Sequence, residues 1–412
     1  MTTASTALPA SAANLRNEAG VIGLVGIAHL VSHFSQLLLA PLFPWLKEAF
    51  HVGYIELGAL MTVFFVVSCA VQTSSGFLVD RFGPRPILFT GLTLLAVAAF
   101  GFASSPNYGT MAFFAVIAGI GNGVFHPVDY TILNRKVSTP RLGHAYSVHG
   151  VTGSLGWAAA PALVLPIAIN FSWRAALVAA GCVVVAVLAV VWFNRDKLEL
   201  PPTLAKPAAA KGPQESSFAF LRIPAVWMCF AFFFVYAIII SVVQAFAPEA
   251  ARQLHDVPRA LAASFLTVYM VCSAGGMVLG GFLASDPARC ERVVGAAFGG
   301  AAVVALVIGL APVPALAVPV LFGVMGFAAG IAGPSRDLLV KRSTPENSTG
   351  RVYGVVYSGL DIGQAFSPLV FGALMDHHNY RGVWLGLVAV QAVLIVSAFN
   401  VRKARRTTLV PA

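Results

Sequence analysis

Uncharged runs of about twenty residues recur along the whole chain, and each is long enough to cross roughly 30 Å of hydrocarbon as a helix. Of the 412 residues, 58% are hydrophobic and 10% are charged, against about 25% charged in an ordinary soluble domain. Because backbone polar groups in lipid must be paired within the protein, runs without strand-like alternation indicate helices. The predicted fold class is an all-α polytopic membrane protein.

Twelve transmembrane helices are predicted in two six-helix bundles. The spans cover residues 21–43, 55–79, 86–104, 109–134, 143–168, 173–193, 223–247, 258–284, 291–311, 314–336, 350–375 and 382–401. Residues 194–222 are rich in proline and polar residues, which is typical of a solvated linker. The chain therefore divides into a flexible tail (1–20), an N-terminal bundle (21–193), the linker, a C-terminal bundle (223–401) and a second tail (402–412). The first tail lacks the pattern of a signal peptide.

Segments of the first half recur in the second half at a spacing of 205 to 207 residues. The pairs are Ser138-Thr-Pro140 with Ser343-Thr-Pro345, Gly143-x-x-Tyr146 with Gly350-x-x-Tyr353, and Gly156-x-Ala-x-x-Pro161 with Gly363-x-Ala-x-x-Pro368. A constant offset across separate segments predicts two copies of one unit.

Basic residues alternate between loops in a way that predicts the orientation of the chain. If both termini are cytoplasmic, 21 Lys and Arg residues lie inside and 5 lie outside. This bias follows the positive-inside rule and predicts a multi-pass protein of the inner (plasma) membrane. The net charge of +10 thus reflects topology, and no nucleic-acid partner is expected.

Twelve spans, a central linker and a half-length parallel repeat resemble the major facilitator superfamily. The loop after the second span, from Gly76 to Arg85, is similar to that superfamily's signature G-x-x-x-D-R-x-G-R-[RK], with Pro84 where Arg is usual. We expect Asp80, Arg81 and Arg85 to form a cytoplasmic gate that is closed in one state and open in the other. The alternative is a solvated loop that only obeys the charge rule.

Two spans carry more local resemblances. The series Gly150, Gly153, Gly156 and Pro161 is similar to the span-five signature of antiporters, although close helix packing alone also explains it. The Phe-His-Pro run at residues 125–127 resembles an element of fosmidomycin-resistance-type exporters, in which Glu follows the Pro. Here Asp129 comes one position later, which turns the carboxylate by about 100° around the helix.

Asp361 is the deepest carboxylate of the chain, near the middle of its predicted span. A charged side chain at mid-bilayer costs roughly 2.5–3.5 kcal/mol on insertion scales, so such residues usually face a cavity and serve a function. Burial favours the neutral form of a carboxyl, which makes Asp361 a candidate proton carrier. A hydrogen bond between helices is the alternative role. Gln364 follows one turn later and is a candidate for the substrate cavity.

His29, His33 and Gln36 form a polar stripe on the first span. An imidazole titrates near physiological pH, so His33 is a candidate partner of Asp361 in proton coupling, and all three residues are candidates for the substrate cavity. The alternative is a set of structural histidines. The His-x-x-x-His spacing also fits a metal, but no third ligand accompanies it nearby, so no metal site is expected.

Further polar residues are expected near the cavity or at its cytoplasmic side. His126 and Asp129 lie three apart on one helix, where they form either a proton relay or a gate with Arg135, and Pro127 should bend that helix. The remaining candidates are Asn122, His149 and Tyr236 for the cavity and Arg336 and Asp337 for the gate, at the inner end of the tenth span.

These features predict a secondary active transporter that works by alternating access. No phosphate-binding loop is present in the sequence, so the proton gradient is the expected driving force. The absence of Lys or Arg from the middle of every predicted span favours a neutral, cationic or weakly acidic substrate. We expect a monomer without cofactors that exports a drug-like compound or metabolite. Proton-coupled import of an organic acid or siderophore-like ligand is the alternative, and an enzyme or an inactive receptor is not expected.

Overall fold

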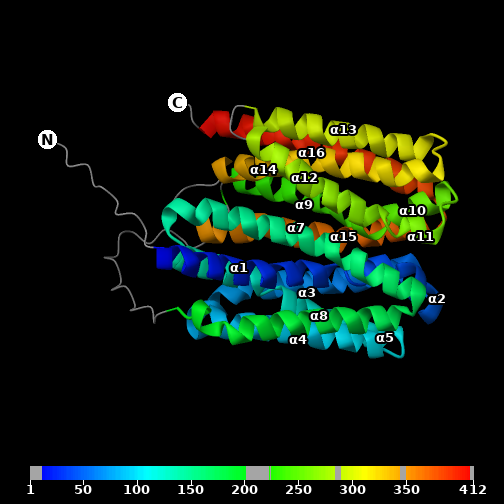
Figure 1. The fold of residues 1–412 in the computed structure, drawn as a ribbon. Helices are drawn as coiled ribbons and strands as arrows, with labels where there is room; N and C mark the ends of the chain where they lie inside the picture. The colour runs from blue at the N-terminus through cyan, green and yellow to red at the C-terminus, as the bar shows by residue number, and fades with distance from the viewer. Residues whose placement is uncertain (1–11, 201–221, 223, 284–288, 344–348, 409–412) are drawn as a thin grey trace.

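The computed structural model describes residues 12–200, 222, 224–283, 289–343 and 349–408, and the long elements within these ranges are α-helices. The helices run roughly parallel and form two lobes, with the first half of the chain below and the second half above (Figure 1). The N-terminal helix begins and the C-terminal helix ends at the same end of the bundle. We call this the termini end and the opposite one the far end.

The bounds of the helices follow the predicted repeat. The first half contains α1 (Ala12–Gln36), η1 (Ala40–Leu42), α2 (Phe43–Phe50), α3 (Tyr54–Phe82), α4 (Pro84–Ser104), α5 (Tyr108–Asn122), α6 (Phe125–Lys136), α7 (Thr139–Asn170), α8 (Trp173–Phe193) and η2 (Arg195–Leu198). The second half contains α9 (Pro224–Ala245), α10 (Ala247–Leu254), α11 (Arg259–Ala262), α12 (Phe265–Leu283), α13 (Cys290–Leu310), η4 (Ala315–Ala317), α14 (Val318–Ser343), α15 (Thr349–Asp376) and α16 (Tyr380–Thr408).

Eleven helical segments of the described chain are long and apolar enough to cross a membrane. The remaining predicted span, 350–375, coincides with α15, which is 28 residues long but is not among the eleven. Its middle carries Asp361 and Gln364, and such polar side chains lower the hydropathy of a helix. The one predicted span that is missing from the eleven is therefore the one that carries the predicted proton carrier.

Several predicted boundaries are wrong because the helices continue past the apolar runs. The helix α1 begins at Ala12 and α16 ends at Thr408, so residues 12–20 and 402–408 of the predicted tails are helical. Both stretches contain strong helix formers such as Ala, Leu, Arg and Lys, and a helix can extend beyond the membrane. The other parts of the predicted tails and linker, 1–11, 201–221 and 409–412, lie outside the described residues.

The predicted fourth span is interrupted between α5 and α6, at residues 123–124. Pro127 has no N–H group to donate to the carbonyl of Gly123, four residues earlier. The hydroxyl of Ser75 on α3 donates to that carbonyl instead, at 3.3 Å. The predicted bend therefore occurs one turn before Pro127, and α3 satisfies the backbone group that the proline leaves unpaired.

Equivalent glycines make close helix contacts in the two halves. A methyl group added at Gly156 on α7 would clash with the carbonyl oxygen of Leu30 on α1. A methyl group added at Gly363 on α15 would clash with the carbonyl oxygen of Phe234 on α9. Because Gly156 and Gly363 are equivalent in the sequence repeat, the two halves use equivalent positions for close backbone packing.

The halves meet along two helix pairs, α3 with α15 and α7 with α12. At the far end, the carboxylate of Asp376 accepts hydrogen bonds from the backbone N–H groups of Tyr54 (2.6 Å) and Ile55 (2.9 Å) at the start of α3. Further inside, the Thr62 hydroxyl donates to the Ala365 carbonyl at 2.6 Å. These contacts hold the far ends of α3 and α15 together.

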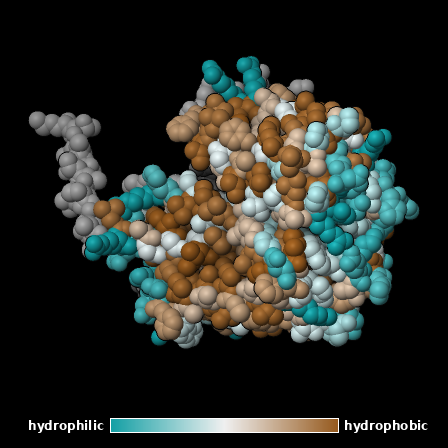
Figure 2. Space-filling model, turned by 45° about the vertical axis from the view of Figure 1, so that its right-hand side comes forward, coloured by the Kyte–Doolittle hydropathy of each residue, from teal (hydrophilic) through white to brown (hydrophobic). Residues whose placement is uncertain are grey.

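Large apolar side chains cover the outside of the bundle, as a surface in contact with lipid requires. Phe113, Phe193 and Val303 are among those that are more than half exposed. Figure 2 shows hydrophobic side chains over much of the visible face and a notch between the two lobes.

The glycine contacts generate a paired prediction. Substitution of Gly156 by Ala should lower the thermal unfolding temperature of the purified protein in detergent, because forced overpacking typically costs about 1–3 kcal/mol. Gly150 lies on the same helix with no neighbouring atom within 4 Å of an added methyl group. Gly150→Ala should therefore leave the temperature unchanged or raise it, and equal destabilisation by both variants would contradict this packing.

Candidate functional site

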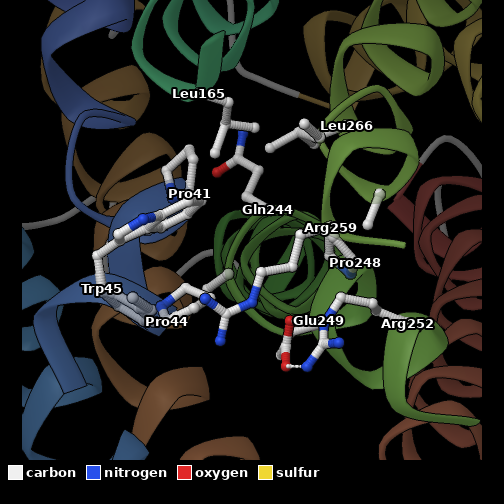
Figure 3. Close-up of a pocket in the computed structure, with 15 residues that line it drawn as sticks. Pro41, Pro44, Trp45, Leu165, Gln244, Pro248, Glu249, Arg252, Arg259 and Leu266 are labelled. Atoms are coloured by element: carbon white, nitrogen blue, oxygen red, sulfur yellow. Dashed lines mark hydrogen bonds and ion pairs between the residues drawn. The ribbon is translucent and has the colours of Figure 1, made fainter. Parts of the chain in front are cut away.

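A pocket lies at the far end between the two halves (Figure 3). Trp45 of α2 lines it from the first half, while Arg252 of α10 and Arg259 of α11 line it from the second half. Both arginines are paired: Arg252 donates to Glu249 at 2.7 Å and Arg259 donates to Glu48 at 2.8 Å. Among the described residues that line this pocket, none was predicted from the sequence as part of the site.

The predicted cavity residues Gln36 and Asn122 are hydrogen-bonded to each other inside the first half. The Gln36 amide donates to the Asn122 side-chain oxygen at 3.1 Å, and the Trp157 indole donates to Gln36 at 3.0 Å. Asn122 also accepts from Ser32 (3.0 Å) and donates to Ser68 (2.8 Å). This network joins α1, α3, α5 and α7, and it uses most of the bonding capacity of Gln36 and Asn122, so we interpret these two residues as structural.

Four histidines and one aspartate meet beside this network, and we call them the His–Asp cluster: His29, His33, His126, Asp129 and His149. One carboxylate oxygen of Asp129 lies 3.0 Å from His29 Nδ1 and 3.1 Å from His149 Nε2. The rings of His29 and His149 stack with centroids 3.5 Å apart, and the centroid of His33 lies 4.3 Å from that of His29. Asp129 is completely buried.

The cluster contains a set of candidate ligands that the sequence spacing did not show. The sequence offered no third ligand beside His29 and His33, but His126 of α6 supplies one in space, with ligand atoms of all three residues within 4.8 Å of one another. A second set of His29, Asp129 and His149 meets the same limit. These residues are capable of holding a transition-metal ion.

Gln72 of α3 links the cluster to Asp361 in the other half. Its amide nitrogen donates to an Asp361 carboxylate oxygen at 3.1 Å, and its amide oxygen lies 3.0 Å from His126 Nδ1. The sequence paired Asp361 with His33, but the structure connects it instead to His126 through this glutamine. The contact crosses the interface between the two halves.

Asp361 lies near the middle of α15 and is 8% exposed. Among the described residues it forms no ion pair with Lys or Arg, and the thiol of Cys69 is within electrostatic range on the adjacent helix. Gln364, one turn later, is also buried, and its side-chain oxygen has no partner among the described residues. The carboxylate therefore faces a mostly neutral environment at the interface.

Tyr236 lies beside Arg336 rather than beside the His–Asp cluster. The Arg336 guanidinium carbon lies 4.3 Å from the centroid of the Tyr236 ring and 5.8 Å from that of Phe233. The apolar span ends at Arg336 as predicted, while the helix α14 continues to Ser343. Since Tyr236 is near the middle of α9, one cation reaches further into the second half than the sequence indicated.

The predicted gate residues gather at the termini end. Arg81 is exposed at the end of α3, Arg135 is exposed in the last turn of α6, and Arg85 lies 3.2 Å from Glu199. The backbones of Asp80 and Asp337 are helical, but their side chains lie outside the described part of the structure. The gate therefore stays a prediction.

Sequence reasoning missed the uncharged members of the site. Gln72 connects Asp361 with His126, and Trp157 contacts both Gln36 and His33. Ser68 accepts a hydrogen bond from Asn122. A glutamine within an apolar span is a detectable signal, but it is weaker than a carboxylate because an amide is much less costly to bury.

Asp129 gives a direct test of the cluster's packing. Substitution by Ala removes the acceptor beside two buried imidazoles, and a buried polar group left without its hydrogen-bond partner costs about 1–3 kcal/mol. Thermal unfolding in detergent should show a large decrease. Glu199 is a matched control: its contact with Arg85 is largely exposed, so Glu199→Ala should change little. A decrease no larger for Asp129→Ala than for the control would contradict the cluster.

Comparison with known proteins agrees with this architecture. The chain is 28% identical over 200 residues to the fosmidomycin resistance protein of Escherichia coli (strain K12), which covers 45% of this chain and 46% of that protein. It is 26% identical to the probable nitrate/nitrite transporter NarK2 of Mycobacterium tuberculosis (strain ATCC 25618 / H37Rv), over 92% of this chain and 95% of that protein. The chain thus aligns with less than half of the first relative and nearly all of the second.

Solved structures show the same fold. A bacterial homolog of the human lysosomal transporter Spinster, in an inward-facing and unoccupied conformation, matches with a TM-score of 0.71 and 15% identity, over 96% of this chain and 99% of that chain. The nucleoside transporter NupG matches with a TM-score of 0.72 and 12% identity, over 92% and 99%. The Major Facilitator Superfamily model matches residues 25–335 and 266–412. The chain therefore belongs to the Major Facilitator Superfamily, whose members are transporters of small molecules and not enzymes.

Proposed function

We propose that this protein exports a small organic molecule in exchange for protons, with Asp361 as the residue that carries the proton. The observation that carries the proposal is the position of Asp361: it is buried at the interface between the halves, and its described hydrogen bond comes from the neutral amide of Gln72. A buried carboxylate without a cationic partner is much more stable when protonated.

This position couples protonation to the relative movement of the halves. Asp361 lies on α15, which packs against α9 in its own half and against α3 across the interface. An ionised Asp361 favours access of water to the interface, whereas a protonated Asp361 can be enclosed at low cost. Binding or release of a proton therefore changes which arrangement of the halves is favoured.

Alternating access also requires contacts that break at one end. The hydrogen bonds of Asp376 to α3 and the ion pair of Glu48 with Arg259 join the halves at the far end. Both are partly exposed and polar, so they can be exchanged for contacts with water at small net cost. We propose that they open to the outside of the cell, with both termini in the cytoplasm as the charge bias of 21 to 5 indicates, and that the protein acts as a monomer.

The direction of transport is taken from the name of the fosmidomycin resistance protein, since resistance is consistent with export. A specific observation favours a second candidate, the proton-coupled import of an anion. Arg336 lies over Tyr236 within the second half and is capable of attracting an organic acid. The printed name of NarK2, a probable nitrate/nitrite transporter, is consistent with an anionic substrate.

Proteoliposomes that contain a pH-sensitive dye test the coupling. Addition of candidate compounds in the presence of a proton gradient should change the internal pH when the compound is transported. Asp361→Asn should abolish this coupled proton flux, because an amide cannot bind and release a proton at physiological pH. Asp256→Asn is the matched control, since it removes an exposed carboxylate at the far end.

Undiminished coupled flux in Asp361→Asn would refute the assignment of the proton to Asp361. Transport that needs no gradient would refute proton coupling. If only anionic compounds are transported, and Arg336→Gln abolishes their transport while Arg336→Lys retains part of it, then the import of an organic acid replaces export as the function.

A further inference from the structure

The His–Asp cluster is not used by the coupling mechanism, although it is the densest group of ligating atoms in the described structure. His29 and His33 come from α1, His126 and Asp129 from α6, and His149 from α7. All but His126 are buried, and His126 is half-buried. So many imidazoles packed ring against ring in a buried position need a common partner or a specific hydrogen-bond network.

Hydrogen bonds fix which nitrogen atom of His126 is available. The Gln72 amide nitrogen donates to Asp361, so the Gln72 amide oxygen faces His126 Nδ1 at 3.0 Å. An oxygen can only accept, so Nδ1 of His126 carries the proton and donates it. In a neutral imidazole this leaves the lone pair on Nε2, which is the form that binds a metal.

His29 and His33 have free ligand positions as well. His29 Nδ1 lies 3.0 Å from an Asp129 carboxylate oxygen but makes no hydrogen bond of good geometry with it, and His29 Nε2 faces Gly153 of α7. Neither ring nitrogen of His33 has a hydrogen-bond partner of good geometry among the described residues. Unpaired polar atoms at this depth are costly, so a ligand that accepts their lone pairs would be bound favourably.

Gly153 keeps the space beside these atoms open. A methyl group added at this position on α7 would lie 2.9 Å from His33 Nδ1 and 3.1 Å from His29 Nε2. Any residue larger than glycine at this position would therefore collide with the nitrogen atoms of His33 and His29 that are candidates for binding a ligand. The half-buried His126 provides the side of the cluster from which an ion can enter.

We propose that His29, His33 and His126 bind a divalent transition-metal ion, with Asp129 as the carboxylate that orients His29. Neutral imidazoles suit Zn²⁺, Co²⁺, Ni²⁺ and Cu²⁺, and three protein ligands leave a fourth position for water or another small ligand. A ligating histidine usually donates its other N–H to a carboxylate, and His29 Nδ1 lies 3.0 Å from a carboxylate oxygen of Asp129.

The distances allow this site after a small adjustment. The ligand atoms lie within 4.8 Å of one another. Tetrahedral coordination with bonds of about 2.0–2.1 Å places ligand nitrogens about 3.3 Å apart, so the rings need to turn inward slightly. His149 shares Asp129 with His29, and we assign it to the support of that carboxylate rather than to the ion.

Cobalt is the probe for this site, because Co²⁺ bound by few ligands has visible absorption bands that free aqueous Co²⁺ lacks at comparable intensity. The full-length protein, purified in detergent with any histidine tag removed, should bind one equivalent and develop these bands. His33→Ala should abolish them. Asp129→Asn should weaken binding by about 10–100-fold, as other changes to such supporting carboxylates do. His144→Ala, an exposed histidine on α7, is the matched control and should have no effect.

Two further measurements keep the test independent of misfolding. Zn²⁺ should raise the thermal unfolding temperature of the unsubstituted protein, since a ligand that binds only the folded state stabilises it. Gly153→Ala retains every ligand and should nevertheless lose the Co²⁺ bands. The proposal is overturned if the unsubstituted protein develops no bands, or if the bands persist in both His33→Ala and His126→Ala.

Discussion

A carboxylate enclosed in a membrane protein must be compensated by a proton, a cation or hydrogen-bond donors, and two buried carboxylates of this chain, Asp129 and Asp361, are compensated differently. Asp129 shares one oxygen between two imidazoles within a single half. Asp361 receives a hydrogen bond from a neutral amide of the other half. Asp129 is therefore suited to a permanent structural or ligating role, and Asp361 is suited to gain and lose a proton as the halves move.

Close helix packing at glycines brings together the residues that surround Asp129 and Asp361. Gly156 brings α7 against α1, so His149 and Gly153 of α7 lie directly beside His29 and His33 of α1. The equivalent Gly363 brings α15 against α9, and α15 then presents Asp361 to Gln72 of α3. The same kind of glycine contact thus supports the His–Asp cluster in the first half and positions Asp361 at the interface in the second half.

The sequence was sufficient for the features that depend on composition and periodicity. The helical class, the repeat and the superfamily follow from apolar runs and from a constant offset between Gly156 and Gly363. The close packing of these glycines was also predictable, because small residues in membrane helices mark close approach. The burial of Asp361 was expected from its position near the middle of its span, and burial of a carboxylate in a membrane is costly.

Features that depend on the distance between separate helices were not predictable. The third imidazole comes from His126, more than ninety residues after His33, so no local spacing could reveal it. Gln72 carried too weak a signal to be recognised as the link to Asp361. The reach of Arg336 towards Tyr236 was missed because the helix α14 extends past the apolar run that was used to estimate its end.

Infrared difference spectroscopy between acidic and alkaline pH tests the central claim most directly, because it detects protonation of buried carboxyl groups without knowledge of the substrate. The account predicts a carboxyl C=O band at acidic pH that disappears at alkaline pH and is absent from Asp361→Asn. A spectrum of Asp361→Asn that is identical to that of the unsubstituted protein would show that Asp361 does not exchange a proton, and it would contradict the account.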